Sequence, residues 1–243
     1  MSKAFTLVYG VERIPYAVTL DPKRTTRIAI HVDPDGSVLV DAPPDFADDA
    51  VRRAVQKRAR WVIKHVADAR NRHAHVRPRE YVSGEQVLYL GRRYMLKVIR
   101  VDAPPGVVRL NGAQLEVKTR TGDPDDIRGR VRAWYRIKAR NYFAKQLAEL
   151  AARMSWVDET PPFRMLDMTR QWGSCSPDGY VILNPGLIRA PRECIEYVLI
   201  HELSHLRHHD HGPEFWRLLA RHVPDWQARK VRLDTMVEAL LRD

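Results

Sequence analysis

Two histidines inside an apolar run place the strongest constraint on how this chain folds. His201 and His205 are four residues apart, and Glu202 directly follows the first, which gives the pattern His-Glu-x-x-His. In an α-helix, residues four apart lie on one face about one turn from each other, so both imidazoles can reach a single ion. Glu202 is rotated by about 100° from His201 and lies beside that ion, where a base for a metal-bound water belongs. The pattern therefore predicts a helix that carries two metal ligands and a general base.

A third histidine is needed to complete such a site, because catalytic zinc usually takes three protein ligands and leaves a fourth position for water. His208 lies about 10 Å further along a straight helix than His201, which is too far for a ligand bond of about 2 Å, and His209 fails for the same reason. His211 stands directly before Gly212-Pro213, where a helix should break and the chain can turn back. We therefore expect His211 to be the third ligand.

The competing interpretation is a solvated amphipathic helix with incidental histidines, because the five-residue motif arises by chance in roughly one or two per hundred chains of this size. Apolar residues at helical spacing argue against a mostly solvated helix. They are Ile195, Val198, Leu199, Ile200, Leu203 and Leu206. A core helix must satisfy the polar groups of two histidines and a glutamate, and metal coordination does so. The flanking sequence therefore favours a metal site.

Composition limits the class of protein. The 243 residues can bury a core as one large domain or two small ones. Cys175 and Cys194 are the only cysteines, and without secretory features they indicate a reducing cytoplasm. No apolar stretch approaches the ~18 residues of a membrane span. We expect a cytoplasmic globular protein with no membrane partner.

A net charge of +11 favours anionic partners such as nucleic acid or nucleotides, although a solvated basic surface explains it equally well. The helices expected at about 48–72 and at 126–154 both have strongly basic faces. For the first of them, a solvated face is the favoured interpretation and a nucleic-acid surface is the alternative.

The order of the segments predicts an α+β protein. Residues 5–42 and 81–118 have strand-like patterns, and they flank the helix at about 48–72. We therefore expect a β-rich N-terminal region at residues 1–120, and this region contains one long helix. The catalytic domain is expected at 121–243.

The expected catalytic domain opens with the long helix and continues into a hairpin. The hairpin runs from Gln171 to Asn184 and turns at Ser176-Pro177-Asp178-Gly179. It directly precedes the metal helix, which is expected to start at Pro191. Another helix is expected to begin near Pro213.

These motifs together resemble the YgjP-like metallopeptidase domain family, which belongs to the zincins and is related to SprT-like and Wss1-like metalloproteases. The stretches that carry the resemblance are Trp172-Gly173-Ser174-Cys175-Ser176, Leu183-Asn184, His201 to His205, and His211-Gly212 followed by Phe215-Trp216. Suggestive N-terminal stretches are Val32 to Gly36, Ala42-Pro43-Pro44, Ser83-Gly84-Glu85 and Tyr89 to Tyr94. The resemblance covers about residues 22 to 240.

The resemblance implies a zincin-like C-terminal fold and one zinc ion per chain. It implies His201, His205 and His211 as ligands and Glu202 as general base, in agreement with the helix geometry. In zincins an edge strand over the metal pairs with an extended peptide, and the hairpin is well placed for this.

Substrate contacts are expected from the hairpin, at Gln171, Trp172, Gly173 and Asn184. The chain departs from the family at Gln171, where arginine is frequent, although Arg170 stands one place earlier. Any role of that arginine is therefore open.

The role of Cys175 and the identity of the oxyanion stabiliser are two further questions about the site. Cys175 is interpreted as a small buried residue near the site and not as a nucleophile, because no separate histidine–carboxylate pair is evident. The oxyanion stabiliser has four unranked candidates: Arg170, Tyr180, Tyr197 and His222.

The leading hypothesis is a zinc-dependent hydrolase, a metallopeptidase acting on a peptide or protein with Glu202 as general base. A metal-dependent nucleotide pyrophosphatase is the first alternative, since some family members are described so and a basic surface suits polyphosphates. A nucleic-acid-associated protease or binding module is the second.

Overall fold

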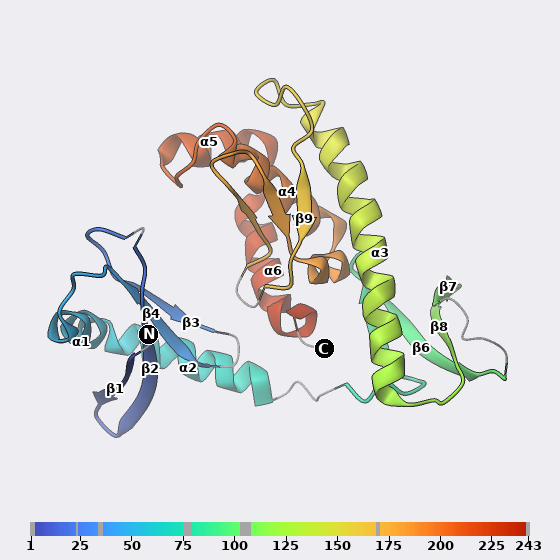
Figure 1. The fold of residues 1–243 in the computed structure, drawn as a ribbon, viewed down its shortest axis with the longest axis horizontal. Coiled ribbons are helices and arrows are strands. Elements are labelled where there is room, and N and C mark those ends of the chain that lie inside the picture. The colour runs from blue at the N-terminus through green and yellow to red at the C-terminus, as the bar shows by residue number, and fades with distance from the viewer. Residues whose placement is uncertain are drawn as a thin grey trace. The chain divides into compact units, whose positions relative to one another are not determined.

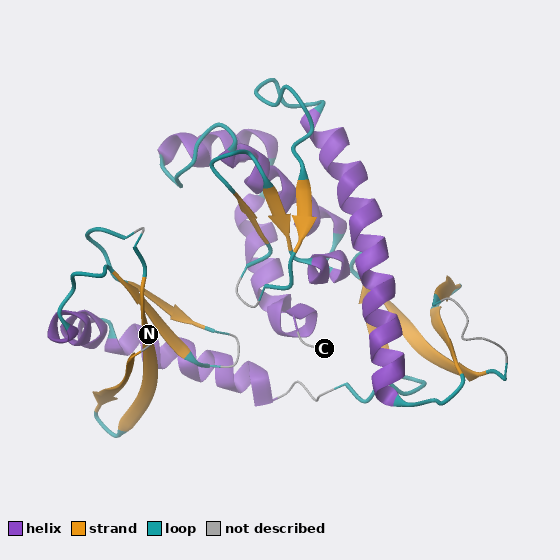
Figure 2. Ribbon diagram, viewed as in Figure 1, coloured by secondary structure: helices purple, strands orange, loops and turns teal. Residues whose placement is uncertain are grey.

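A computed structural model describes residues 3–22, 24–33, 36–74, 79–102, 108–168 and 171–241. The chain divides into two compact units, residues 1–77 and 78–243. Helices and sheets are mixed in both units, which confirms the α+β class (Figure 2). No helix among the described residues combines the length and the apolar character that crossing a membrane requires.

The N-terminal unit is a four-stranded sheet followed by two helices. Its strands are β1 (Lys3–Tyr9), β2 (Glu12–Leu20), β3 (Ala29–Val32) and β4 (Val38–Ala42), in the order β1-β2-β4-β3. The helices are α1 (Asp48–Lys57) and α2 (Ala59–Ala74).

The prediction of a single helix at about 48–72 was wrong in one respect, because the helix is interrupted at Arg58. The break lets two helices place their apolar faces on the same sheet. Val51 and Val55 of α1 share one core with Val62 and Val66 of α2 and with the strands.

The C-terminal unit opens with a second four-stranded sheet. Its strands are β5 (Gln86–Tyr89), β6 (Arg92–Arg100), β7 (Arg109–Asn111) and β8 (Gln114–Thr119), in the order β5-β6-β8-β7. Helix α3 (Pro124–Ala151) follows, with Asp123 as its N-cap.

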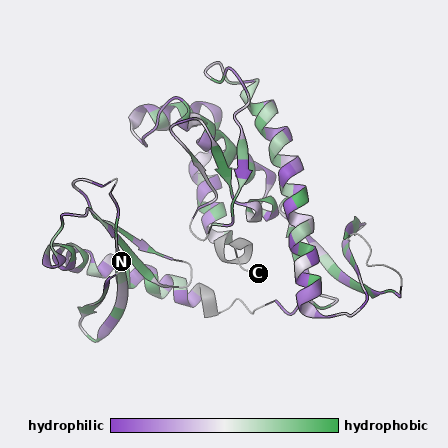
Figure 3. Cartoon of the chain, viewed as in Figure 1, coloured by the Kyte–Doolittle hydropathy of each residue, from purple (hydrophilic) through white to green (hydrophobic). Residues whose placement is uncertain are grey.

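The sequence assigned these strands to the N-terminal region, but they fall in the C-terminal unit. The physical reason is that Leu96 and Leu115 share one core with Ile127 and Val131 of α3. Hydrophobic and hydrophilic residues alternate along α3, as its helical periodicity requires (Figure 3).

A small sheet and four helical segments complete this unit (Figure 1). Strands β9 (Phe163–Met165), β10 (Gly173–Cys175) and β11 (Val181–Leu183) are ordered β10-β11-β9, so β10 is an edge strand. The 3₁₀ helix η1 (Pro185–Arg189) leads into α4 (Arg192–His205), α5 (Pro213–His222) and α6 (Trp226–Leu241).

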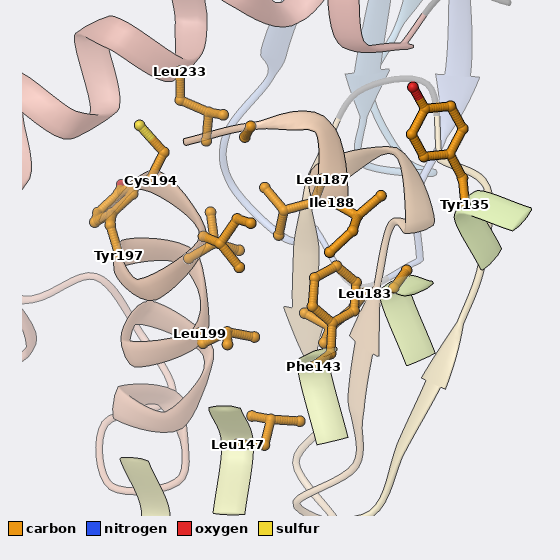
Figure 4. Packing of buried hydrophobic residues seen from close by; sticks show 14 of the residues in the cluster. Tyr135, Phe143, Leu147, Leu183, Leu187, Ile188, Cys194, Tyr197, Leu199 and Leu233 are labelled. Atoms are coloured by element: carbon orange, nitrogen blue, oxygen red, sulfur yellow. The ribbon is translucent and has the colours of Figure 1, made fainter. Parts of the chain in front are cut away.

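The core of the C-terminal unit lies between α3, the small sheet and α4. Phe143 and Leu147 of α3, Leu183 of β11 and Leu199 of α4 converge there (Figure 4). All four side chains are fully buried. Because α4 packs in this core, the direction of its side chains is fixed by its neighbours.

The turn between β5 and β6 packs against η1 and the residue that precedes α4. Leu90 and Gly91 donate backbone hydrogen bonds to the carbonyl groups of Ile188 (3.0 Å) and Arg189 (3.1 Å). Gly91 has a φ of +76°, and a Cβ there would lie 2.8 Å from Cα of Pro191. Only glycine fits this close approach, so the turn anchors the start of the helix.

Candidate metal centre

Helix α4 carries His201 and His205 as the sequence predicted. It starts directly after Pro191, and nine of its residues are buried. The rings of the two histidines lie 5.0 Å apart between centroids, on one face of the helix. An amphipathic surface helix would not be buried to this extent, so the solvated interpretation of the motif is excluded.

His211 approaches the same point from outside the helix. The chain leaves α4 after His205 and re-enters a helix at Pro213, so His211 lies in the connecting loop. Its Nε2 atom is 3.0 Å from Nε2 of His201. One nitrogen from each of His201, His205 and His211 lies within 4.8 Å of the others. Among the described histidine, cysteine and acidic residues, these three histidines form the group whose ligand atoms lie close enough together to hold a metal ion.

The chemistry of this cluster fits a divalent metal such as zinc. Burial lowers the pKa of all three histidines, that of His201 to about 3. The imidazoles are therefore neutral at physiological pH, which is the form that binds metal. Nδ1 of His205 lies 3.1 Å from the backbone carbonyl of His208, and a donated proton there leaves Nε2 available as ligand. Three neutral imidazoles make a donor set typical of catalytic zinc.

Glu202 lies beside the histidine cluster in an enclosed position. Its side chain is 4% exposed, and burial raises its pKa to about 8. The backbone of Gly173 covers it, because a Cβ at that glycine would lie 2.7 Å from Oε1 of Glu202. A carboxylate with a proton affinity near neutral pH is suited to exchange protons with a substrate or water.

Strand β10 brings part of the expected substrate-binding segment to α4. Gly173 lies on this strand, and Trp172 is half-buried against the core directly before it. Gln171 is exposed. Because β10 is at the edge of its sheet, one side of its backbone has no strand partner among the described residues.

Asn184 is used differently from the expected contact with substrate. It is 3% exposed, and its Nδ2 atom donates to the carbonyl groups of Met168 (2.7 Å) and Gln171 (3.4 Å). Its Oδ1 atom accepts a hydrogen bond from the amide of Gly186 at 2.9 Å. The amide group thus ties the segment before β10 to the start of η1.

Three of the four candidate oxyanion stabilisers lie among the described residues, and they have different surroundings. The ring of Tyr197 is 6.0 Å from that of His201 but is 6% exposed, whereas Tyr180 is 38% exposed on the β10–β11 hairpin. His222 packs edge-on against Trp156 at 4.9 Å. Arg170 lies outside the described residues.

Cys175 has the properties of a structural thiol. Burial, together with the charge of Glu202, raises its pKa to about 11. A thiol that stays protonated is a poor nucleophile. This favours the interpretation of Cys175 as a small packed residue.

Aromatic residues around the histidines were not assigned a role from the sequence. Phe215 packs against all three rings, with centroid distances of 4.9 Å to His201, 4.6 Å to His205 and 4.7 Å to His211. Trp216 follows it on α5. The only sequence signal was the occurrence of both residues in the family motif.

The comparison with family models agrees with this geometry. A family model described as the YgjP-like metallopeptidase domain matches residues 26–236, so the resemblance noted from the motifs is confirmed. The crystal structure of the metallopeptidase zymogen of Pyrococcus abyssi abylysin is 25% identical, covering 41% of this chain and 96% of that one with a TM-score of 0.35. A search of curated proteins found no significant match. The family match, which spans most of both units, identifies a metal-dependent peptidase domain.

Proposed function

We propose that this chain, which belongs to the YgjP-like metallopeptidase family, hydrolyses peptide bonds with one zinc ion held by His201, His205 and His211. Glu202 is the general base. The observation that supports this assignment most directly is the convergence of three neutral imidazoles within 4.8 Å beside a buried carboxylate. Location in the cytoplasm stays a prediction from the sequence.

The residues of the chain divide the chemistry between them. Zinc, when bound, supplies an acidified water and polarises the scissile carbonyl. Glu202 accepts the proton of the water and passes it to the leaving amine. Burial raises the pKa of the Glu202 carboxyl group above its usual range, which makes the carboxylate a stronger proton acceptor.

Strand β10 is the proposed substrate-binding edge. An extended peptide can add to an edge strand through main-chain hydrogen bonds, and β10 contacts the helix that carries Glu202. Gly173 lies on this edge, and Gln171 and Trp172 directly precede it. We assign Asn184 an indirect role, because its amide holds this segment in place through Met168.

Glu202→Gln tests the catalytic assignment. The amide keeps the size of the side chain but has no basic oxygen, so cleavage of casein or a peptide should be lost. Zinc content, measured by elemental analysis, should stay at one ion per chain, because Glu202 is not a ligand. Full activity in this variant would refute the role of Glu202, and a wild-type protein without bound zinc would refute the ligand set.

A second candidate, hydrolysis of nucleoside triphosphates at the same centre, is favoured by the net charge of +11. Pyrophosphate release from a nucleoside triphosphate that depends on Glu202 would favour it over proteolysis.

Nucleic-acid binding by the basic helices also stays a prediction. It requires an affinity for DNA that falls steeply with salt, and no binding at low salt would exclude it.

A further inference from the structure

The three histidines differ in how their rings are held. His201 and His205 are fixed by the buried helix α4, and His205 has an additional contact to the His208 carbonyl. His211 lies in a loop and is exposed. Within the described part of the chain, the hydrogen bond found for its side chain is the one to His201. A ligand on a loop needs another means of orientation, because a metal site requires its ligands in fixed directions.

Stacked aromatic rings provide that means. The indole of Trp216 lies against the imidazole of His211, with centroids 5.5 Å apart and planes inclined by 26°. The indole of Trp226 stacks in turn on the indole of Trp216, with centroids 4.5 Å apart and planes inclined by 21°. His211, Trp216 and Trp226 thus form a continuous series of near-parallel rings, which we call the three-ring stack. Stacked aromatic pairs are favourable beyond the area that they bury.

The far end of the three-ring stack is anchored to the helix that carries the other two ligands. Trp226 is the first residue of α6. One turn later, Arg229 pairs with Glu196 of α4 at 2.7 Å and donates to the carbonyl of Glu193 at 3.1 Å. Arg232 of α6 also pairs with Glu193. The position of Trp226 is therefore coupled to α4 by charged contacts that do not involve the metal site.

We propose that Trp226 is a positioning residue for the metal centre: through Trp216 it fixes the ring of His211 so that the third imidazole faces His201 and His205. This inference rests on the proposed function only in taking these histidines as the ligands. This role requires no contact of Trp226 with substrate or metal. It acts through the three-ring stack, which replaces the hydrogen bond that orients many metal-binding histidines.

Metal affinity tests the inference independently of catalysis. Trp226→Leu keeps much of the volume and removes the ring, whereas Trp226→Phe keeps a ring. Competition with a chromogenic chelator should show zinc binding weakened roughly 2- to 10-fold in the leucine variant, the range expected for loss of one aromatic pair. The phenylalanine variant should bind close to the wild-type affinity. The absorption spectrum of the cobalt-substituted protein should change in the leucine variant, because it reports on ligand geometry.

A double-mutant cycle separates positioning from a general loss of stability. If Trp226 acts through Trp216, then Trp226→Leu should have no further effect on zinc affinity in a Trp216→Leu background. Trp61→Leu, the same change in the N-terminal unit, is the matched control and should leave affinity unchanged. Circular dichroism must show that each variant is folded at the temperature of the measurement.

The outcomes are distinct. Wild-type affinity and an unchanged cobalt spectrum in Trp226→Leu would overturn the positioning role, and so would effects of the two tryptophans that simply add. If the wild-type protein binds no zinc, the proposed function itself fails. A lower melting temperature in Trp226→Leu without a change in zinc affinity would reveal a purely structural role and would also overturn the inference.

Discussion

The contact between Gly173 and Glu202 makes a sharp prediction about the proposed general base. An added Cβ at Gly173 would lie 2.7 Å from Oε1 and 2.9 Å from Cδ and Cγ of Glu202. The backbone of Gly173 is not in the left-handed region, so alanine introduces no conformational strain there. Gly173→Ala therefore changes one thing, the space available to the carboxylate.

Two consequences follow from this contact. If β10 and α4 hold their places, the overpacking costs about 1–3 kcal/mol of folding stability. If Glu202 moves instead, a displacement of about 1 Å can lower the rate by about 100-fold. Because Glu202 is 4% exposed and has little room to move, we expect part of the strain to lower the folding stability and part to displace the carboxylate and lower the rate.

Three measurements test the prediction: kcat/KM with a peptide substrate, the melting temperature and the zinc content. We expect a large loss of kcat/KM, a moderate loss of melting temperature and unchanged zinc content. Gly129→Ala is the matched control, because a Cβ there meets no atom within 4 Å and α3 should gain about 0.5–1 kcal/mol. Wild-type activity and stability in Gly173→Ala would refute the view that β10 holds the carboxylate in place.

Three further predictions concern the metal, the start of α4 and the histidines. A chelator should abolish peptide cleavage and lower the melting temperature, because the metal stabilises the folded state that binds it, and added zinc should restore both; activity that resists the chelator would contradict metal dependence. Gly91→Ala should lower the free energy of unfolding by more than about 1 kcal/mol in urea titrations, because φ is +76° and Cα of Pro191 would be 2.8 Å away; wild-type stability would contradict the anchoring turn. Without metal, stability should fall as the pH drops below about 6.5, since the unfolded chain takes up protons while burial lowers the pKa of His201 to about 3. Urea titrations at several pH values measure this dependence, and it should weaken in His201→Leu.

The helix that carries His201 and His205, and the approach of His211 to them, could be predicted because the signals are local. Helical spacing places His201 and His205 on one face, and a break before Gly212-Pro213 takes His211 out of the helix, although α4 already ends at His205 and Pro213 opens α5. Both are properties of a few consecutive residues. The structure brings His211 to the position that this reasoning required.

Other features depend on contacts between distant segments, and the sequence pattern does not contain them. Strands β5–β8 belong with α3 because their apolar faces share a core, which no local periodicity reveals. The break at Arg58 follows from how two helices fit one sheet. Asn184 looked like a substrate contact because it is polar and close to the motif, but its amide is satisfied by backbone groups.

The roles of Gly173 and Trp226 were also hidden for this reason. A glycine in a strand suggests only that something approaches closely, and it does not say what. Trp226 lies 15 residues beyond His211 in the sequence, yet a second indole joins them. Such roles become visible only once the tertiary contacts are known.

The short edge at β10 has a consequence for selectivity. Three residues offer too little main chain to start a growing sheet, so this half-buried edge is a weak template for self-association. A peptide can pair with it only when its own backbone groups are free of other partners. An enzyme that recognises chains in this way distinguishes targets by their state of folding before it distinguishes them by their sequence.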